Sequence, residues 1–346
     1  MTLIYFILVL GITILIHEFG HFIFAKKAGV HCYEFSIGMG PRLFKWNRKN
    51  DETDYSIRLF PIGGYVSMAG ESIEMDPNVP KNKHLQKKTW WQRFSIMFAG
   101  VLFNYLLAIV CFTIVALKTG APTNVPYIKE VSEGYSAYEE QVPVDSIITK
   151  INDTNIINLD HLSLVITSVN GQDINLTVKT KEGNLETYAL TPKKEEENGK
   201  TVYRYGFAIG TEYEKGFFKA IKYGFTKMFS LFYQMILIIG YLITGKLSLG
   251  SLSGPVGIYS IVGESAKAGL INLVYLVGYL CVNVGVINII PLPAFDGGHI
   301  LFLIIEKIKG KPVSQKVENT IHGIGMAFLI LLMIAISIND IIKLIK

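Results

Sequence analysis

The sequence contains little charge for its length. Only 18% of its 346 residues are Asp, Glu, Lys or Arg, whereas 50% are hydrophobic and 12% are aromatic. Soluble globular domains carry about 25% charged residues, so this composition favours membrane spans over one large water-soluble core. It also excludes a disordered chain, which has few aromatic and apolar side chains.

The chain also lacks an excess of positive charge and a cysteine framework. Its 33 Lys and Arg oppose 28 Asp and Glu, and a net charge of +5 is too balanced for a dedicated nucleic-acid binder. Cys32, Cys111 and Cys281 lie far apart and form no CxxC pair. The sequence therefore predicts neither a disulfide scaffold nor a cysteine metal site.

Long uncharged runs are what the sequence does have. Residues 95–117, 271–290 and 323–339 contain no Asp, Glu, Lys, Arg or His, and about 20 apolar residues cross a bilayer as a helix. A fourth run, from residue 3, continues through residue 24 but contains His17, Glu18 and His21. No positive charge precedes this run and no small-residue cleavage site follows it, so we interpret it as a span and not as a signal peptide. The sequence predicts four crossings.

The two long segments between the apolar runs differ in their balance of charged residues. Residues 25–94 hold 12 Lys and Arg against 7 Asp and Glu, whereas residues 118–215 hold 10 against 15. The positive-inside rule therefore places the first segment on the cytoplasmic side of the cell (plasma or inner) membrane and the second segment outside. With four crossings, both termini are extracytoplasmic.

Residues 217–244 are ambiguous. The segment is apolar enough to cross, but polar side chains recur along it every three or four residues, as in a helix that lies in the membrane interface: Lys215, Lys219, Lys222, Thr226 and Ser230. A crossing here would also move the lysine-rich loop at 307–316 outside. We therefore predict an interfacial helix.

Residues 121–212 are expected to form a small extracytoplasmic α+β domain. Tyr127–Val131, Asn152–Ile157 and Ile174–Thr180 are strand-like, residues 159–169 are helical in pattern, and Lys193–Lys200 has the composition of a charged loop. Their order resembles a PDZ domain, with residues 144–148 (Val-Asp-Ser-Ile-Ile) in place of the usual Gly-Asp-x-Ile. Such a domain either binds an extended chain at a sheet edge or serves as a spacer.

The sharpest motif is His17-Glu18-Phe19-Gly20-His21 inside the first apolar run. On a helix, residues i and i+4 share a face, so both imidazoles can bind one ion while Glu18 reaches a water as general base. Ionisable groups are costly in lipid, which favours a functional role. Catalytic zinc takes three protein ligands, so a third must come from elsewhere.

The region from 288 to 299 is the candidate source of that ligand. Residues 271–305 are too long for one straight crossing, and Pro291 and Pro293 interrupt them. Irregular backbone at membrane depth is tolerated only beside protein or a water-filled cavity. Asp296 in this break needs a partner, and a dication is suitable.

Arg58–Met68 is expected to form a β-hairpin around Gly63 and Gly64, associated with the membrane. A peptide bond within a transmembrane helix must unwind before water can attack it. The edge of such a hairpin could supply the hydrogen bonds that lipid cannot.

Together, HEFGH and the later NIIPLPAFDGG resemble the site-2 protease family of intramembrane zinc metalloproteases, and most closely its bacterial RseP/RasP-like branch, which regulates sigma-factor signalling. Further matches are Arg58–Val66, Gly100 with Asn104, and Ser253–Ile258. The sequence departs from the family in Phe295, where leucine is usual, and in having one PDZ-like domain where some relatives have two.

The resemblance implies a role for each site residue. It makes His17, His21 and Asp296 the ligands of one Zn²⁺ and Glu18 the catalytic base. Substrate binding then falls to residues near the proline break and on the hairpin: Asn283, Asn288, Pro291, Pro293, Gly63, Gly64 and Tyr65. The implied substrates are single-pass membrane proteins such as anti-sigma factors, or remnant signal peptides, and a site-1 protease cuts them first.

The expected organisation has four parts: a first membrane half (1–120), the PDZ-like domain (121–212), an interfacial helix (213–250) and a second membrane half (251–346). Two other functions would account for part of the sequence. A transporter would explain broken helices and buried charge, but no inverted repeat is found and the HExxH spacing would have no role. A non-catalytic PDZ scaffold would not need all four catalytic residues.

Overall fold

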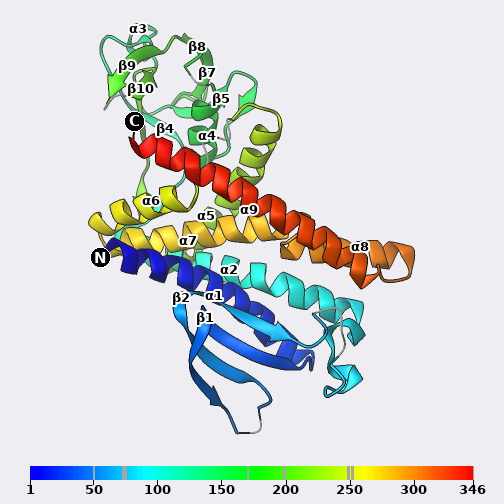
Figure 1. Cartoon of the computed structure of the whole chain (residues 1–346). Helices are drawn as coiled ribbons and strands as arrows, with labels where there is room; N and C mark the ends of the chain where they lie inside the picture. Colours follow the sequence, from blue (N-terminus) through cyan, green and yellow to red (C-terminus); the bar gives the residue numbers. More distant parts are fainter. Residues whose placement is uncertain are drawn as a thin grey trace. The chain divides into compact units, whose positions relative to one another are not determined.

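The computed structural model of the chain describes residues 1–49, 51–71, 76–169, 171–197, 200–247, 250 and 253–345. The chain forms two compact units, one of Met1–Val115 with Leu249–Lys346 and one of Ala116–Ser248. The first is mainly helical with a long hairpin, and the second is a β-rich insert followed by a helix (Figure 1). The boundary predicted at 250/251 adjoins positions 248–249 and 251–252, which lie outside the described residues.

Five of the described helices are long and apolar enough to cross a membrane. They are α1 (Thr2–Lys27), α2 (Trp90–Thr119), α5 (Phe217–Ile243), α7 (Leu270–Ile289) and α9 (Gln315–Ile345). Many of their large apolar side chains are exposed, such as Phe328 and Leu331 on α9, which suits a surface solvated by lipid. The chain is therefore a multi-pass membrane protein. Four of these helices are the expected spans, and the fifth is α5.

Small residues let α1 approach its neighbours closely. A Cβ atom on Gly20 would lie 2.4 Å from the carbonyl oxygen of Ala99 on α2, so only glycine permits this helix crossing. On another face, Val9 of α1 packs in a core with Val262 of α6 (Pro255–Lys267) and Leu276 of α7. The HExxH helix is thus fixed on two sides.

The start of α6 is held by the carboxylate of Asp340 on α9. Its Oδ2 accepts hydrogen bonds from the backbone N–H groups of Gly254 and Gly257 at 2.8 and 2.9 Å. An acidic side chain at a helix N-terminus satisfies otherwise unpaired donors. A Cβ on Gly254 would lie 3.0 Å from this oxygen, which explains the glycines of the Ser253–Ile258 motif.

The hairpin exists, but the predicted turn was wrong. Strand β1 (Cys32–Asn47) pairs antiparallel with β2 (Asp54–Met68), and the chain reverses between them, at 48–53. Gly63 and Gly64 lie within β2, beside α1 (Figure 1). Gly63 has φ +72°, and a Cβ there would lie 2.7 Å from Ile14 of α1. The glycines thus permit close approach to a helix and do not form the turn.

A buried carboxylate ties the hairpin strands together. Glu34 on β1 accepts hydrogen bonds from Ser56, Arg58 and Tyr65 on β2. Burial alone would raise the pKa of Glu34, but these donors outweigh it and lower the pKa to about 2. Glu34 is therefore ionised at physiological pH and fixes the strand pairing.

The β-rich insert is built on an antiparallel sheet with the order β11-β4-β5-β7-β8, and β6 pairs with β5. Its strands are β4 (Tyr127–Val131), β5 (Ile147–Ile151), β6 (Thr154–Asn155), β7 (Ile174–Lys179), β8 (Leu185–Leu190) and β11 (Phe207–Gly210). Helix α4 (Leu159–Val169) contributes Leu162 and Val165 to a core with Ile128, Ile148 and Leu176. The short remaining elements are β3 (Ala121–Pro122), α3 (Ser136–Glu139) and β12 (Tyr213–Glu214).

The sequence predicted apolar elements of this core correctly, but its predictions for the polar segments of the insert were wrong. The predictions of strands at β4 and β7 and of a helix at α4 were confirmed. The strand expected at 152–157 is reduced to β6, because the apolar run preceding it, Ile147–Ile151, forms the strand. The loop expected at Lys193–Lys200 was wrong: β9 (Lys193–Glu197) pairs with β10 (Lys200–Arg204), so backbone pairing forms a hairpin that has almost no apolar signal.

Helix α5 belongs to the second unit and packs on α4 through a buried polar cluster. Asp160 of α4 accepts from Lys227 Nζ and Ser230 Oγ at 2.6 Å each, and its carbonyl accepts from Gln234 at 3.0 Å. The polar stripe expected to face water is therefore partly internal, since Ser230 and Lys227 are only 6% and 8% exposed. A buried charge of this kind needs its partner.

Candidate metal centre and active-site cavity

Helix α1 carries His17 and His21 one turn apart on the same face, as the HExxH spacing predicts. Both side chains are buried, at 6% and 5% exposed. Their rings meet edge to face with centroids 4.8 Å apart. The helix thus presents two imidazoles side by side in the interior of the first unit.

Asp296 reaches the same point from the opposite end of the sequence. Helix α7 ends at Ile289 and α8 (Asp296–Lys309) begins after a break that contains both prolines, which confirms the predicted interruption. Ala294 in the break has φ +74°, a left-handed conformation that non-glycine residues seldom adopt. The sharp reversal places Asp296 in the first turn of α8.

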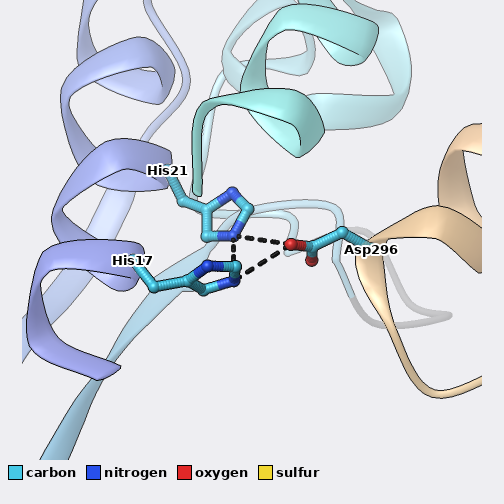
Figure 2. Close-up of side chains that lie close together, drawn as sticks. All are labelled: His17, His21 and Asp296. Atoms are coloured by element: carbon cyan, nitrogen blue, oxygen red, sulfur yellow. Dashed lines mark hydrogen bonds and ion pairs between the residues drawn. The ribbon is translucent and has the colours of Figure 1, made fainter. Parts of the chain in front are cut away.

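The three side chains converge, as Figure 2 shows. Oδ2 of Asp296 lies 3.0 Å from Nε2 of His17 and 3.3 Å from Nε2 of His21. The two Nε2 atoms are 3.2 Å apart. All three potential ligand atoms lie within 4.8 Å of one another, although 279 positions separate His17 from Asp296 in the sequence.

The donor set fits zinc. Two imidazole nitrogens and one carboxylate oxygen are a usual combination at catalytic zinc, which keeps a fourth position open. Asp296 Oδ2 is buried and makes no hydrogen bond of ordinary geometry to any described residue. An acceptor buried in this way beside two imidazole nitrogens is suited to a cation.

Helix α2 packs directly against the imidazoles. A Cβ on Gly100 would lie 2.4 Å from Nε2 of His21 and 2.7 Å from Cε1 of His17, so glycine is required there. The backbone carbonyl of Ile96 lies 2.7 Å from Nδ1 of His21. Asn104, one turn beyond Gly100, contacts Nδ1 of His17.

Glu18 lies beside this cluster and lines a cavity of about 450 Å³ with His21 and Asp296. The backbone of Val66 on β2 lies near the Glu18 carboxyl group. Val66 and Met68 also line the cavity. The end of β2 and Glu18 of α1 therefore border the same cavity.

The substrate-binding residues expected from the sequence are absent from the described lining of the cavity. Asn288 donates to the carbonyl of Val284 within its own helix at 3.0 Å. The Tyr65 hydroxyl donates to Glu34 at 2.7 Å. Gly63 and Gly64 lie on β2, where it passes α1, and Pro291 and Pro293 lie in the break. Asn283 is half-buried on α7.

Sequence reasoning missed the residues that hold the break. Nδ1 of His322 on α9 accepts the backbone N–H of Ala294 at 2.9 Å, and a Cβ on Gly325 would lie 2.2 Å from Pro293. His322 also stacks on His299 with parallel rings 4.0 Å apart. The stacked rings pack against the loop of the break, and with Glu318 they form a second group whose potential ligand atoms lie within 4.8 Å of one another.

Helix α8 is fixed at its other end as well. Arg93 of α2 forms a two-pronged ion pair with Glu306, and Trp90 donates to the carbonyl of Leu303 at 2.6 Å. Such forked pairs are geometrically specific. Only proximity in the folded chain reveals these contacts, because residues about 210 positions apart share no local pattern.

Comparison with known proteins gives a consistent result. The model of peptidase family M50 matches residues 5–332. The chain is 30% identical to the regulator of sigma-W protease RasP of Bacillus subtilis (strain 168), over 99% of both proteins. It is also 34% identical to a Staphylococcus aureus (strain N315) protein named "Putative zinc metalloprotease SA1105", over 98% of both, and 30% identical to zinc metalloprotease RasP of Bacillus licheniformis, over 99% of both.

Proposed function

Because this chain belongs to peptidase family M50 and is an intramembrane zinc metalloprotease of the site-2 protease type, we propose that it cleaves transmembrane segments of single-pass membrane proteins. One observation carries the proposal: His17, His21 and Asp296 converge beside Glu18, and both histidines and Glu18 lie on α1, which is apolar enough to span a bilayer. Membership of a protease family leaves no place for the transporter or the non-catalytic scaffold.

In this proposal His17, His21 and Asp296 hold one zinc ion. Bound zinc polarises the scissile carbonyl and makes the attacking water more acidic. Glu18 takes the proton of that water and transfers it to the leaving amine. Glu18 and Val66 both line the cavity in which this proton transfer would take place.

An unwound substrate needs partners for its backbone. We propose that β2 supplies them along the stretch that contains Gly63, Gly64 and Tyr65, because this stretch leads to Val66 beside Glu18. Added strands bind through main-chain hydrogen bonds with little regard to side chains. Asn283, Asn288, Pro291 and Pro293 are proposed to contact the substrate from the side of the α7–α8 break.

The proposed substrates follow from the relatives. The relative from Bacillus subtilis is named "Regulator of sigma-W protease RasP", so anti-sigma factors are the first class to test, and remnant signal peptides are the second. We propose that a site-1 protease trims the outer part of such proteins before this chain acts on the remaining span.

A comparison of membrane fractions tests the proposed function. Cells producing the Glu18→Gln variant should accumulate intact transmembrane segments of single-pass proteins that disappear in cells producing the unaltered chain. Quantitative mass spectrometry of membrane peptides detects both populations. Identical membrane fragments in the two strains would contradict the proposal.

The proposed topology follows from the lysine and arginine counts. We propose that both termini and the β-rich insert are extracytoplasmic, with α5 along the outer interface and the β1–β2 hairpin on the cytoplasmic side. The α8–α9 turn at Gly310, flanked by Lys309 and Lys311, would then face the cytoplasm. A cysteine placed at 310, in a chain without its native cysteines, should react with an impermeant reagent only from that side.

The β-rich insert, proposed to be PDZ-like over residues 121–212, is proposed to select substrates by size. The segment at Val144 and Asp145 lacks the glycine of a carboxylate-binding loop, which makes capture of a new C-terminus the weaker alternative. An excluding domain would reject proteins that still carry a bulky outer part, so trimming becomes the trigger.

Deletion of residues 123–211 separates exclusion from capture. The deletion removes Asp160 and leaves Lys227 without that partner, so the variant should also carry Lys227→Met. Under exclusion, the variant cleaves an untrimmed substrate that the intact chain refuses, and the terminal residues of the trimmed substrate matter little. Slower cleavage of the trimmed form, with continued refusal of the untrimmed one, would support capture. Lys227→Met alone is the control.

A further inference from the structure

The two imidazoles of the centre must each carry their proton on a defined nitrogen. Nε2 of His17 and Nε2 of His21 are the atoms that face Asp296. If these atoms bind a cation, their lone pairs must be free, so the ring protons must lie on Nδ1. Each Nδ1–H then needs an acceptor, because both rings are buried.

For His21 the acceptor is a backbone group. The carbonyl oxygen of Ile96 lies 2.7 Å from Nδ1, and a carbonyl can only accept. Nδ1 of neutral His21 must therefore carry the ring proton, which leaves the lone pair of Nε2 free. The acceptor cannot be altered by side-chain substitution.

For His17 the corresponding group is a side chain. The Asn104 amide nitrogen lies 3.3 Å from Nδ1 of His17, and Asn104 is completely buried. Its Oδ1 is buried too and has no donor within the described chain. A half-turn about Cβ–Cγ exchanges the two amide atoms and brings the oxygen to Nδ1, since O and N of an amide occupy equivalent places.

We propose that Asn104 is a positioning residue that accepts the Nδ1–H of His17 through Oδ1 and thereby keeps Nε2 free for zinc. The inference rests on the proposed ligand set. Under this proposal, each histidine donates its Nδ1–H to an acceptor on α2: His21 to the carbonyl of Ile96, and His17 to Asn104. That helix therefore selects the tautomers as well as packing against the rings through Gly100.

The opposite role for Asn104 has a different consequence. If its N–H donated to Nδ1, the neutral His17 ring would carry its proton on Nε2, which excludes metal binding there. An aspartate at 104 can accept but, when ionised, cannot donate. The Asn104→Asp variant therefore distinguishes an acceptor from a donor at nearly constant shape.

Zinc affinity of the purified full-length chain in detergent, measured by competition with a chromophoric chelator, is the readout. Asn104→Leu keeps the volume but removes the acceptor, and loss of such an outer partner typically weakens metal binding about 10- to 100-fold. Asn104→Asp should stay within about threefold of the unaltered chain. Phe112→Leu is the matched control: it lies on α2 with a completely buried ring, so it should lower the melting temperature without weakening zinc binding.

The possible results distinguish an error in the role of Asn104 from an error in the proposed ligand set. Unchanged affinity in Asn104→Leu, or loss in a folded Asn104→Asp as large as in Asn104→Leu, would overturn the proposal. Should Asn104→Asp fail to fold, ¹⁵N-histidine spectra of the unaltered zinc-loaded chain decide, because a proton on Nδ1 of His17 is required. Zinc retained by the His17→Ala, His21→Ala double variant would instead refute the ligand set itself.

Discussion

Replacing His17 and His21 together by alanine is expected to reduce bound zinc from about one ion per chain to none, and to abolish proteolysis. The two imidazoles are two of three ligand atoms gathered within 4.8 Å, and Asp296 alone cannot hold zinc at micromolar concentrations. Catalytic zinc with three protein ligands depends on each of them. Metal analysis of the purified protein by mass spectrometry measures the loss directly.

A control separates ligand loss from general damage to a buried histidine. His161 in α4 is also buried, at 4% exposed, but it lies in the second unit, so His161→Ala should retain zinc. Asp296→Asn should bind zinc more weakly than the unaltered chain, since a neutral amide is a poorer ligand than a carboxylate. Stoichiometric zinc in the double histidine variant would show that the ion is held elsewhere.

The second large effect is expected for Glu18→Gln, which should keep zinc but lose about 10²- to 10⁴-fold in cleavage rate, the usual contribution of a general base. Glutamine preserves the shape of the side chain but cannot accept a proton at neutral pH. Cleavage of a purified transmembrane substrate in detergent, with zinc measured on the same sample, gives both quantities.

Another carboxylate in the same cavity provides the comparison. Glu71 lines the cavity and accepts the backbone N–H of Met68 at 3.2 Å, so Glu71→Gln changes the local charge by the same amount. It should remain within about tenfold of the unaltered rate, as expected for a group outside proton transfer. Full activity in Glu18→Gln would mean that the base lies elsewhere.

The parts of this molecule that were predictable are those with a local signal. HExxH fixes two imidazoles on one helical face by spacing alone, and two prolines in an apolar run must break a helix. Uncharged runs similarly identify spans without knowledge of their neighbours. For the same reason, two core strands of the insert, β4 and β7, could be located from their apolar content.

What could not be predicted depends on contacts between distant residues. Gly63 and Gly64 have the composition of a turn, and only the proximity of Ile14 reveals that they relieve a close approach. The polar side chains of α5 were expected to face water, as in an interfacial helix. Their buried partner, Asp160, lies 67 positions before Lys227, so the sequence around α5 gives no sign of the contact. From the sequence, Asn104 could be identified only as a residue shared with the site-2 protease family, because 87 positions separate it from His17, which it contacts.

The separation of the proposed ligands between the two ends of the chain has a consequence for biosynthesis. Translation supplies His17 and His21 first, and a nascent chain holds only this incomplete pair until residue 296 has been added. Metal binding requires the assembled set, so an unfinished chain has no competent hydrolytic centre while it is inserted next to other newly made membrane proteins.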